Sequence, residues 1–386
     1  MPTVAPGAGA ELAELIADAR ASGTRLELRG GASKAGIGRP ARDATLVDMR
    51  GFAGVVDYDP AELVLTVRAG TRLAEIEALV AGQRQMLAFE PFDHAPLFGA
   101  APGAATIGGV VAAGVSGSRR LVAGGVRDHL LGFTGVSGRG EAFVAGAKVV
   151  KNVTGYDLPK VAAGSWGRLM ALTEVTLKVM PAPQQTATRV IAGLSPAQAY
   201  AAMAAAMGSQ ADVSAAAHLP GATSRTVFRV QGFGPSVAAR CALLERLLGA
   251  HATVDAPDEV EAAAIWAALR TLDPLGVVEP LWRVSIPARA FPAIAAMLDE
   301  TGARWLADWA GGLVWAAFAG DPAVIRTAAA RAGGHATLVR GGGDLPAVPT
   351  FQPRPDGLAA LEARVRRAFD PDGVFEIDRF GDADAD

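Results

Sequence analysis

The sequence predicts an α+β protein with two lobes, and three observations support this fold class. The first part of the chain mixes single helices with groups of short strands. The second part, about 185–350, alternates alanine-rich helices with strands, which is typical of a ferredoxin-like lobe. A proline-containing stretch around 181–183 separates the two parts. The chain is 51% hydrophobic and 19% charged, so it can bury a large core and is not disordered.

In the first part, apolar spacing and alternation indicate the elements in order. A helix is expected at 11–21, where Leu12, Ile16 and Ala19 share one face. Strands follow, with an Asp-Pro turn at 59–60, and a second helix begins at Gly70. After a glycine-dense segment, further strands lead to the prolines. The expected strands are 25–29, 45–49, 55–58, 63–68, 133–136, 141–150 and 169–179.

The second part has clearer helical periodicity. Its expected helices are 195–207, 237–248, 261–272, 291–299 and 322–332, and its expected strands are 225–230, 281–286, 304–308, 313–318 and 336–339. A glycine run at 341–343 opens a linker, and a last helix is expected at 357–369. We therefore expect three units: a first domain at 1–183, a smaller lobe at 184–345, and a C-terminal helix with an acidic tail at 346–386 that returns to the first domain.

Composition excludes several classes of function. The net charge is −3 and the pI about 6.0, so no nucleic-acid footprint is present. The single cysteine, Cys241, cannot form an internal disulfide or a cluster held by four thiolates. The N-terminus lacks a signal-peptide pattern, and the apolar run 107–115 is far shorter than the ~20 residues of a spanning helix. We expect a cytoplasmic protein that could still dock on a membrane-bound partner.

Glycine is concentrated in one region and marks a first candidate loop. Of the 46 glycines, 16 lie between Gly99 and Gly167 without a regular period. Just before this region, the loop Arg29–Lys34 (RGGASK) directly follows a strand. Successive backbone N–H groups in such a turn form an anion nest, and a neighbouring Arg or Lys adds positive charge. The loop predicts a phosphate site, with an ordinary strand-end turn as the alternative.

Two further loops have a similar character. The segment from Thr106 to Gly117 is typical of a glycine-containing helix N-terminus that can contact a phosphate, with tight helix packing as the alternative. It is neither a Walker loop nor the usual nicotinamide motif. The third loop runs from Lys151 to Leu158 and continues to Gly164–Gly167, and alone it is an ordinary loop. Together, the three loops predict one long, phosphate-bearing ligand.

Four motifs carry a resemblance to a known family. They are PxxxTIGG from Pro102, SGxRR from Ser116, VRD from Val126 and KNxxGYDL from Lys151. This pattern resembles the FAD-binding domain of the p-cresol methylhydroxylase (PCMH) and vanillyl-alcohol oxidase superfamily, and within it the FAD-binding E subunits of bacterial glycolate oxidases. The resemblance covers about 25–183 well, covers the second lobe weakly and returns at 368–375. It implies a PCMH-type FAD-binding domain followed by a smaller cap lobe.

The resemblance also implies where FAD binds. The first loop would wrap the pyrophosphate, the segment 102–117 would follow the pyrophosphate, ribityl chain and flavin, and 164–172 would lie nearer the adenine. The expected FAD-binding residues are Arg29, Gly30, Gly31, Ala32, Ser33, Lys34, Pro102, Gly103, Ala105, Thr106, Gly108, Gly109, Ala113, Gly114, Ser116, Gly117, Gly164, Gly167 and Leu172. We expect the glycines to be bare because the FAD contacts leave no room for Cβ, so that Gly108→Val would lose FAD rather than fold.

Departures from the family pattern carry further expectations. The usual third glycine of the first loop is Ala32 here, so this residue is expected to avoid positive φ. Members with a histidyl-linked flavin have His where this chain has Ser33, which implies noncovalent FAD. Near the C-terminus, Glu376-Ile377-Asp378 replaces the common Asn-Pro-Gly. The histidine-rich metal motif of the related D subunit is absent and the five histidines are scattered, so no metal is expected.

Oxidation of a 2-hydroxy acid by this chain would need two further groups. A cation must hold the carboxylate, and a base must accept the hydroxyl proton. Arg283, in a strand of the second lobe, is the candidate cation, with an arginine at a sheet edge or subunit interface as the alternative. His94, just before the flavin segment, is the candidate base. The tryptophans Trp305, Trp309 and Trp315 fit core or interface positions better than a substrate cage.

The resemblance implies an FAD-dependent oxidoreductase, as a subunit of a glycolate oxidase (dehydrogenase) complex that converts a 2-hydroxy acid to a 2-oxo acid. It implies two partners, a second flavin subunit and an iron–sulfur subunit, through which the chain could lie peripherally on the inner membrane. Since Cys241 cannot hold a cluster, electrons would leave through another chain. Two alternatives stay open: a stand-alone FAD-dependent dehydrogenase for D-lactate-like acids, and a flavin-bearing structural subunit without its own chemistry.

Overall fold

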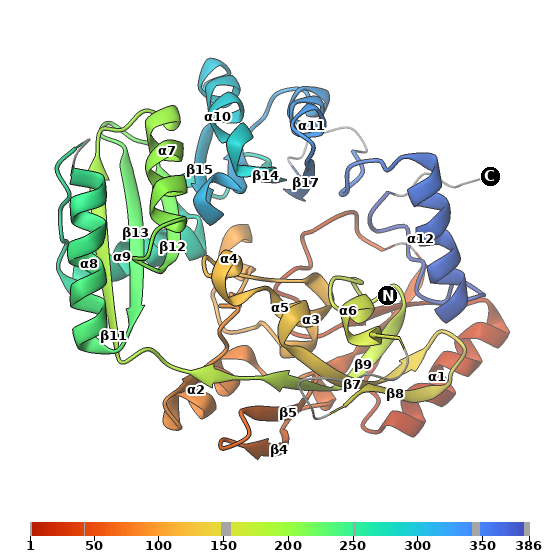
Figure 1. Cartoon of the computed structure of the whole chain (residues 1–386). Helices are drawn as coiled ribbons and strands as arrows, with labels where there is room; N and C mark the ends of the chain where they lie inside the picture. Colours follow the sequence, from red (N-terminus) through yellow and green to blue (C-terminus); the bar gives the residue numbers. More distant parts are fainter. Residues whose placement is uncertain (1, 42, 148–155, 250–251, 342–347, 382–386) are drawn as a thin grey trace.

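The structure is a computed structural model that describes residues 2–41, 43–147, 156–249, 252–341 and 348–381. Over these residues it contains sheets of three, five and seven strands and one two-stranded ribbon. Helices pack against the sheets, and the seven-stranded sheet forms a lobe of its own above the others (Figure 1). The mixture of helices and separate sheets confirms the α+β prediction.

A small parallel sheet forms near the N-terminus. Its strand order is β1 (Thr3–Val4), β3 (Ala44–Asp48) and β2 (Arg25–Arg29), and both neighbouring pairs are parallel. Helix α1 (Gly9–Ser22) connects β1 to β2 and buries Leu12 and Ile16 in the core of this region. Because β2 ends at Arg29, the first glycine loop begins directly at the end of this strand.

The second sheet is antiparallel and carries the remaining glycine loops. Its order is β4 (Val55–Asp59), β5 (Val64–Arg68), β9 (Met170–Lys178), β7 (Leu130–Ser137) and β8 (Ala142–Gly146). The associated helices are α2 (Leu73–Gly82), α3 (Ile107–Ala113), α4 (Arg120–Ala123), α5 (Val126–His129) and α6 (Leu158–Ala162). Beside it, β6 (Gln85–Met86) pairs with β10 (Met180–Pro181).

The seven-stranded antiparallel sheet builds the second lobe. Its order is β11 (Gln185–Ala192), β13 (Arg225–Gly232), β12 (Val213–Leu219), β15 (Arg304–Asp308), β16 (Leu313–Ala317), β14 (Leu281–Ser285) and β17 (His335–Arg340). Its helices are α7 (Pro196–Met207), α8 (Gly234–Gly249), α9 (Glu259–Thr271), α10 (Phe291–Glu300) and α11 (Pro322–Arg331). The prolines that begin α7 and α11 suit the first helical turn.

The second lobe consists of two ferredoxin-like units that share this sheet. The later unit runs β14, α10, β15, β16, α11 and β17, which is the βαββαβ order of that fold. The earlier unit runs β11, α7, β12, β13 and α8, and its fourth strand is reduced to one antiparallel bridge between Val190 and Asp255. The units join where β12 meets β15, through the pair His218 and Ala307.

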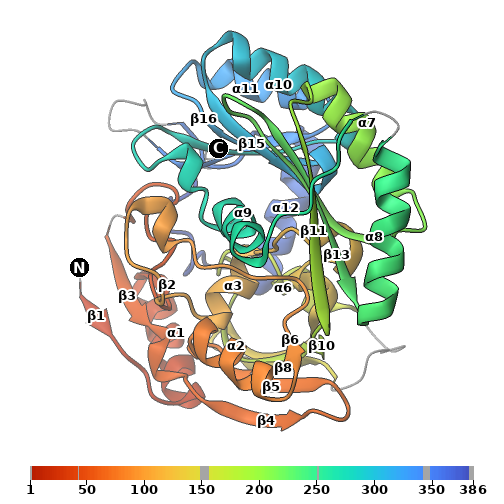
Figure 2. The same cartoon turned by 90° about the vertical axis from the view of Figure 1, so that its left-hand side faces the viewer.

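Alternation along the strands separates two faces of the sheet. In β14, Trp282 and Val284 point into the core beneath α7, α8, α10 and α11, while Leu281 belongs to the core shared with the first lobe. Helix α9 lies on this second face, where Ile265 and Leu269 join the shared core (Figure 2). Arg283, which alternates with Trp282 and Val284, is therefore on the face directed toward the first lobe.

After helix α12 (Asp356–Phe369) the chain packs against the first lobe, on the right-hand side of Figure 1. The segment that follows packs Val374 and Phe375 against the core of α1 and β2. Asp370 fixes this turn, because its carboxylate accepts hydrogen bonds from the backbone N–H groups of Val374 (2.9 Å) and Phe375 (2.8 Å). The C-terminal segment thereby reaches the first glycine loop.

Candidate functional site

A cavity of about 700 Å³ lies between the first sheet, α3 and the C-terminal segment. The first loop forms one wall, the segment 166–172 another, and residues 363–380 a third. Its wall carries seven Lys or Arg side chains but only four Asp or Glu side chains, so a negatively charged ligand is favoured. Its size lies within the usual range for ligand sites, roughly 300–1,000 Å³.

The first loop presents unused backbone donors to this cavity. Among the described residues, no acceptor takes a hydrogen bond from the backbone N–H groups of Gly31, Ala32, Ser33 or Lys34. These groups belong to consecutive residues that line the cavity. Successive free amides in a turn form a concave site for an anion, so the loop fits a phosphate-bearing cofactor. The cavity, the free amides and the excess of cations therefore fit FAD.

Ala32 corrects one expectation from the sequence. Its φ angle is +59°, so it does adopt the left-handed conformation that it was expected to avoid. This conformation costs an L-residue with a Cβ atom roughly 1–2 kcal/mol. The loop thus keeps the backbone geometry that a glycine would allow, although the side chain has changed to alanine.

The start of α3 corrects a second expectation. The sequence predicted that amides here would contact a phosphate, but the protein already uses them. The N–H of Ile107 donates to the carbonyl of Thr71 (3.0 Å), that of Gly108 to the carbonyl of Ala69 (2.7 Å), and that of Gly109 to the Thr106 Oγ1 (3.4 Å). The free amides of the site are therefore those of the first loop rather than those at the start of α3.

The reason for the bare glycines also differs from the prediction. A Cβ on Gly30 or Gly31 would overlap Thr106 or the carbonyl of Ala104, and one on Gly108 would lie 2.8 Å from the Cβ and carbonyl oxygen of Ala69. Close packing of protein segments, and not the cofactor alone, excludes Cβ at these positions. Gly108→Val is therefore expected to damage the fold, contrary to the expectation from sequence.

The predicted cofactor residues divide into two groups. Those lining the 700 Å³ cavity are Arg29, Gly30, Gly31, Ala32, Ser33, Lys34, Thr106, Gly108, Gly109, Ala113, Gly167 and Leu172. Those outside its lining are Pro102, Gly103, Ala105, Gly114, Ser116, Gly117 and Gly164. Three members of the second group have structural reasons for glycine, since Gly103, Gly114 and Gly164 have φ of +110°, +67° and +85°. The string Lys151–Gly155 lies outside the described residues.

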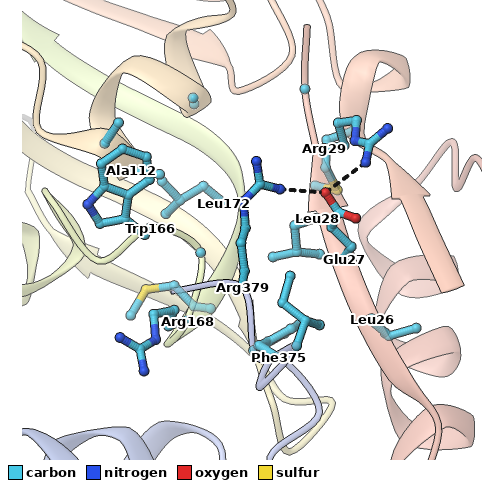
Figure 3. Close-up of a pocket in the computed structure, with 18 of the residues that line it drawn as sticks. Leu26, Glu27, Leu28, Arg29, Ala112, Trp166, Arg168, Leu172, Phe375 and Arg379 are labelled. Atoms are coloured by element: carbon cyan, nitrogen blue, oxygen red, sulfur yellow. Dashed lines mark hydrogen bonds and ion pairs between the residues drawn. The ribbon is translucent and has the colours of Figure 1, made fainter. Parts of the chain in front are cut away.

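The sequence did not predict the charged network behind the first loop. Glu27 is buried and accepts hydrogen bonds from Arg29 (2.8 Å) and from Arg379 (2.7 Å), as Figure 3 shows. One carboxylate is therefore paired with two guanidinium groups, so this part of the cavity wall keeps a net positive charge. Among the residues that the structure describes, the buried Nε of Arg29 has no hydrogen-bond partner. Alternation along β2 places Glu27 on the face opposite Leu26, and nothing in the sequence signals that this face is also buried.

Lys34 completes the positive wall of the first loop. Burial lowers the pKa of its ammonium to about 8, while the nearby Asp93 opposes this shift. The side chain is therefore still mostly protonated at neutral pH. Asp93 itself accepts hydrogen bonds from the backbone N–H groups of Ala95 (2.9 Å) and Gly103 (2.8 Å), and so it fixes the segment that packs on the first loop.

A second cavity of about 250 Å³ lies between the two lobes and includes Ser116 and Gly117. An ion pair between Glu90 and Arg229 (2.8 Å) crosses this interface with both side chains about 90% buried. The Ser118 hydroxyl donates to Asp308 (2.7 Å), and the Trp309 indole N–H donates to the carbonyl of Gly117 (2.9 Å). These bonds fasten the cap lobe to the segment predicted to follow the flavin.

Arg283 lies in the same interface with an aromatic surrounding. Its guanidinium carbon is 5.1 Å from the ring centre of Trp309 and 6.0 Å from that of Trp315, and it donates to Ser285 Oγ (3.1 Å). Within the described part of the chain, Arg283 has no carboxylate partner. Burial and the nearby Arg120 lower its pKa to about 10, so it remains a cation at neutral pH.

His94 is buried and neutral. Its ring stacks on Phe92 at 4.5 Å between ring centres. Burial, followed by the positive charges of Lys34 and Arg283, holds the pKa of His94 well below its usual value of 6.5. The 3.4 Å distance from Nδ1 to the carbonyl of Phe92 suits an Nδ1–H donor, which leaves Nε2 as an acceptor. The two predicted catalytic candidates thus lie close enough to interact electrostatically.

Two searches of the described residues were negative. No group of three or more His, Cys, Asp or Glu side chains there could hold a metal ion. No helix among them is both long and apolar enough to cross a membrane.

Comparisons with known proteins give a consistent picture. Residues 2–146 match a family described as "FAD binding domain". The "Glycolate oxidase subunit GlcE" of Escherichia coli (strain K12) is 35% identical over 370 residues, which cover 95% of this chain and 96% of that protein. A D-lactate dehydrogenase of Anaerostipes hadrus is 32% identical over 170 residues, which cover 44% of this chain and 33% of that protein.

The structural comparison concerns the fold alone. The structure of an alkyldihydroxyacetonephosphate synthase matches with a TM-score of 0.67 at 16% identity, covering 96% of this chain and 76% of the other. The match spans the first lobe, the second lobe and the returning C-terminal segment. Together with the family match over residues 2–146, it confirms the predicted fold, an FAD-binding domain of the PCMH type followed by a second lobe.

Proposed function

Because the chain belongs to the family of glycolate oxidase E subunits, which are FAD-binding oxidoreductases, we propose that it is the FAD-binding subunit of a glycolate oxidase or dehydrogenase complex. Its reaction converts a 2-hydroxy acid to a 2-oxo acid. The observation that carries this proposal is the extent of the similarity to the Escherichia coli subunit, which includes 95% of this chain and therefore both lobes. FAD is the cofactor, and Ser33 in the first loop supports a noncovalent attachment.

The first loop is the part of the chain best suited to hold the pyrophosphate of FAD. The free N–H groups of residues 31–34, with Lys34 and Arg29 beside them, supply donors and positive charge. Small residues of α3 together with Leu172 line the continuation of the cavity. When bound, FAD supplies the acceptor for the two electrons and the hydrogen removed from the substrate.

Arg283 and His94 are suited to the substrate. Arg283 is a cation without a carboxylate partner among the described residues, and the aromatic rings of Trp309 and Trp315 restrict its position. It would hold the carboxylate of the 2-hydroxy acid. His94 is neutral at pH 7, so its imidazole would accept the hydroxyl proton at Nε2. His94 is buried and Arg283 is partly buried, so contact of both groups with bulk water is restricted.

Partner subunits are implied by the similarity to named subunits of glycolate oxidase, and the composition of this chain agrees with that. The only cysteine, Cys241, is buried in α8 and cannot hold an iron–sulfur cluster. We therefore assign electron transfer to an iron–sulfur subunit, with a second flavin subunit in the same complex. Any attachment to the cytoplasmic face of the inner membrane would be indirect, through these partners.

Flavin content and activity test the proposal in two steps. Purified chain should show flavin absorbance, or should recover it with added FAD, and a sample that does neither contradicts the proposal. The assembled complex should then oxidise glycolate or D-lactate, and omission of this chain should abolish that activity. Arg283→Met should raise KM for the acid by about tenfold or more, whereas the exposed Arg289→Met serves as a matched control.

The same assay separates the alternatives. The pairing of Arg283 with a neutral His94 favours a stand-alone dehydrogenase as the second candidate, and this predicts turnover by the isolated chain with a dye acceptor. Activity only after addition of the partner subunits rejects it. A purely structural subunit predicts that the flavin of this chain stays oxidised while the complex turns over.

A further inference from the structure

Arg379, in the segment after α12, makes an unusual number of contacts with the first loop and the turn that follows it. Its Nε donates to the carbonyl of Ile37 (2.9 Å), and its Nη2 donates to the carbonyls of Lys34 (2.9 Å) and Ala35 (2.7 Å). Its Nη1 donates to Glu27 (2.7 Å). The backbone takes part as well, because the carbonyl of Arg379 accepts a hydrogen bond from the N–H of Arg39 (2.6 Å).

These contacts orient the loop. A held carbonyl fixes the peptide plane that it shares with the N–H of the next residue, so Arg379 fixes the planes that contain the N–H groups of Ala35, Gly36 and Gly38, directly after the free amides of the loop. Within the described loop there are two backbone hydrogen bonds: the N–H of Ala35 donates to the carbonyl of Ala32 (2.9 Å), and the N–H of Ile37 donates to the carbonyl of Lys34 (3.1 Å). Arg379 therefore supplies much of what keeps the backbone of 34–37 in one conformation.

Electrostatics connect the same side chain to the cavity. Glu27, 2% exposed, is shared between Arg379 and Arg29, and both arginines line the cavity (Figure 3). Glu27 neutralises only one of the two guanidinium charges. Without Arg379, the remaining pair Glu27–Arg29 would be neutral, and the excess of positive charge in the cavity wall, which favours a diphosphate, would be smaller by one.

We propose that Arg379 is a positioning residue for the cofactor: it holds the carbonyls of Lys34, Ala35 and Ile37, which fixes the backbone directly after the free amides of residues 31–34 and so keeps those amides directed at the pyrophosphate of FAD. The C-terminal segment is thus part of the cofactor site, although it lies far from the first loop in sequence. This inference rests on the proposed FAD site in the first loop.

Affinity for FAD, measured with the purified full chain stripped of flavin, tests this inference. Arg379→Met should raise the dissociation constant for FAD about tenfold or more, measured by flavin fluorescence quenching. Arg331→Met makes the same chemical change at an exposed site at the end of α11 and should leave affinity unchanged. Riboflavin, which has no phosphate, should bind equally to the wild type and to both variants.

Chemical rescue distinguishes positioning from a general loss of structure. In Arg379→Ala, added guanidinium ion at millimolar concentration should restore FAD affinity, while methylammonium, which lacks the planar fork, should not. Unchanged FAD affinity in Arg379→Met overturns the inference. The inference also fails if Arg379→Ala loses FAD binding together with the circular dichroism spectrum of the folded chain, and guanidinium does not restore binding. If the wild-type chain itself fails to bind FAD, the proposed function fails instead.

Discussion

Single residues in this protein are held in conformations or charge states that their type alone would not favour. Ala32 occupies the left-handed region in the first loop. Trp309 and Ala310 do the same at the end of β15, where the loop contacts the carbonyl of Gly117. Such backbone strain persists only when the surroundings determine it, and in both cases the surroundings are the two candidate sites.

Asp308 is a buried carboxyl group whose charge costs stability at neutral pH. Burial raises its pKa to about 6, although bonds from Ser118 and the backbone N–H of Trp309 oppose the shift. The folded protein therefore holds this proton at pH values where the unfolded chain, with a pKa near 3.8, has released it. By linkage, the contribution of Asp308 to stability declines as pH rises from about 4 to 6.

Asp308→Asn should remove this dependence on pH. An amide can accept from the Trp309 N–H and donate to the Ser118 hydroxyl, so both contacts remain possible. The quantity to compare is the unfolding free energy of the variant minus that of the wild type. This difference should be about 1–3 kcal/mol larger at pH 7 than at pH 4.5. Urea unfolding at both pH values measures this difference. The exposed Asp18→Asn is the control, and an equal difference at both pH values would contradict the prediction.

At the scale of elements, local patterns predicted the strands that alternate and the helices that are amphipathic. RLELR gave β2 with its observed bounds, 25–29, because polar and apolar residues alternate there. Strand β12 was not predicted, because all seven of its residues are buried and three are alanines, which favour helix in isolation. Strand β11 was also missed, next to the prolines. The strand expected at 141–150 ends at Gly146 in β8, and residues 148–150 lie outside the described ranges.

The candidate site was predictable only where its parts are contiguous in sequence. Glycine-rich loops identify themselves by composition, and so the first loop and the start of α3 were found. Which of their amides are free depends on Ala69 and Thr71, which the sequence does not link to α3. Arg379 could not be assigned to the first loop, because only the returning α12 brings the two together.

Two neighbouring glycines at the start of α3 should respond differently to substitution. A Cβ on Gly108 would lie 2.8 Å from the backbone oxygen of Ala69, whereas one on Gly109 would lie 3.4 Å from the side chain of Thr106. Gly108→Ala should therefore destabilise the chain by about 1–3 kcal/mol. Gly109→Ala should be neutral or slightly stabilising, because alanine favours helix. Thermal unfolding of the flavin-free chain measures both, and equal melting temperatures would refute the packing explanation.

For the whole molecule, the contact between the lobes is polar as well as apolar. The buried pair Glu90–Arg229 crosses from the segment before α3 to β13, and the guanidinium carbon of Arg229 lies 4.5 Å from the ring centre of Trp266. Glu90 also accepts a hydrogen bond from the N–H of Arg119 (3.0 Å). These bonds hold the cap lobe in one position above the segment predicted to follow the flavin, and that position also places Arg283.

Removal of one partner of this ion pair should loosen the lobes. Arg229→Met leaves Glu90 as a buried charge without its cation, which typically costs about 3–5 kcal/mol. The double variant Glu90→Gln, Arg229→Met should recover part of this loss, because no buried charge is left unpaired. Urea unfolding measures the free energies, and limited proteolysis between the lobes reports their separation. A single variant as stable as the wild type, or a double variant less stable than the single one, would contradict this account.

The contact between Arg379 and the first loop also has a consequence for the order in which the protein is made. The ribosome produces the loop long before the guanidinium that bonds to it, because Arg379 lies 345 residues after Lys34 in the sequence. Until Arg379 is synthesised, the loop lacks these hydrogen bonds, and of the two arginines that pair with Glu27 only Arg29 is present. A nascent chain or a fragment that stops before α12 has the glycine motif but not the finished site, so cofactor loading belongs to the completed polypeptide.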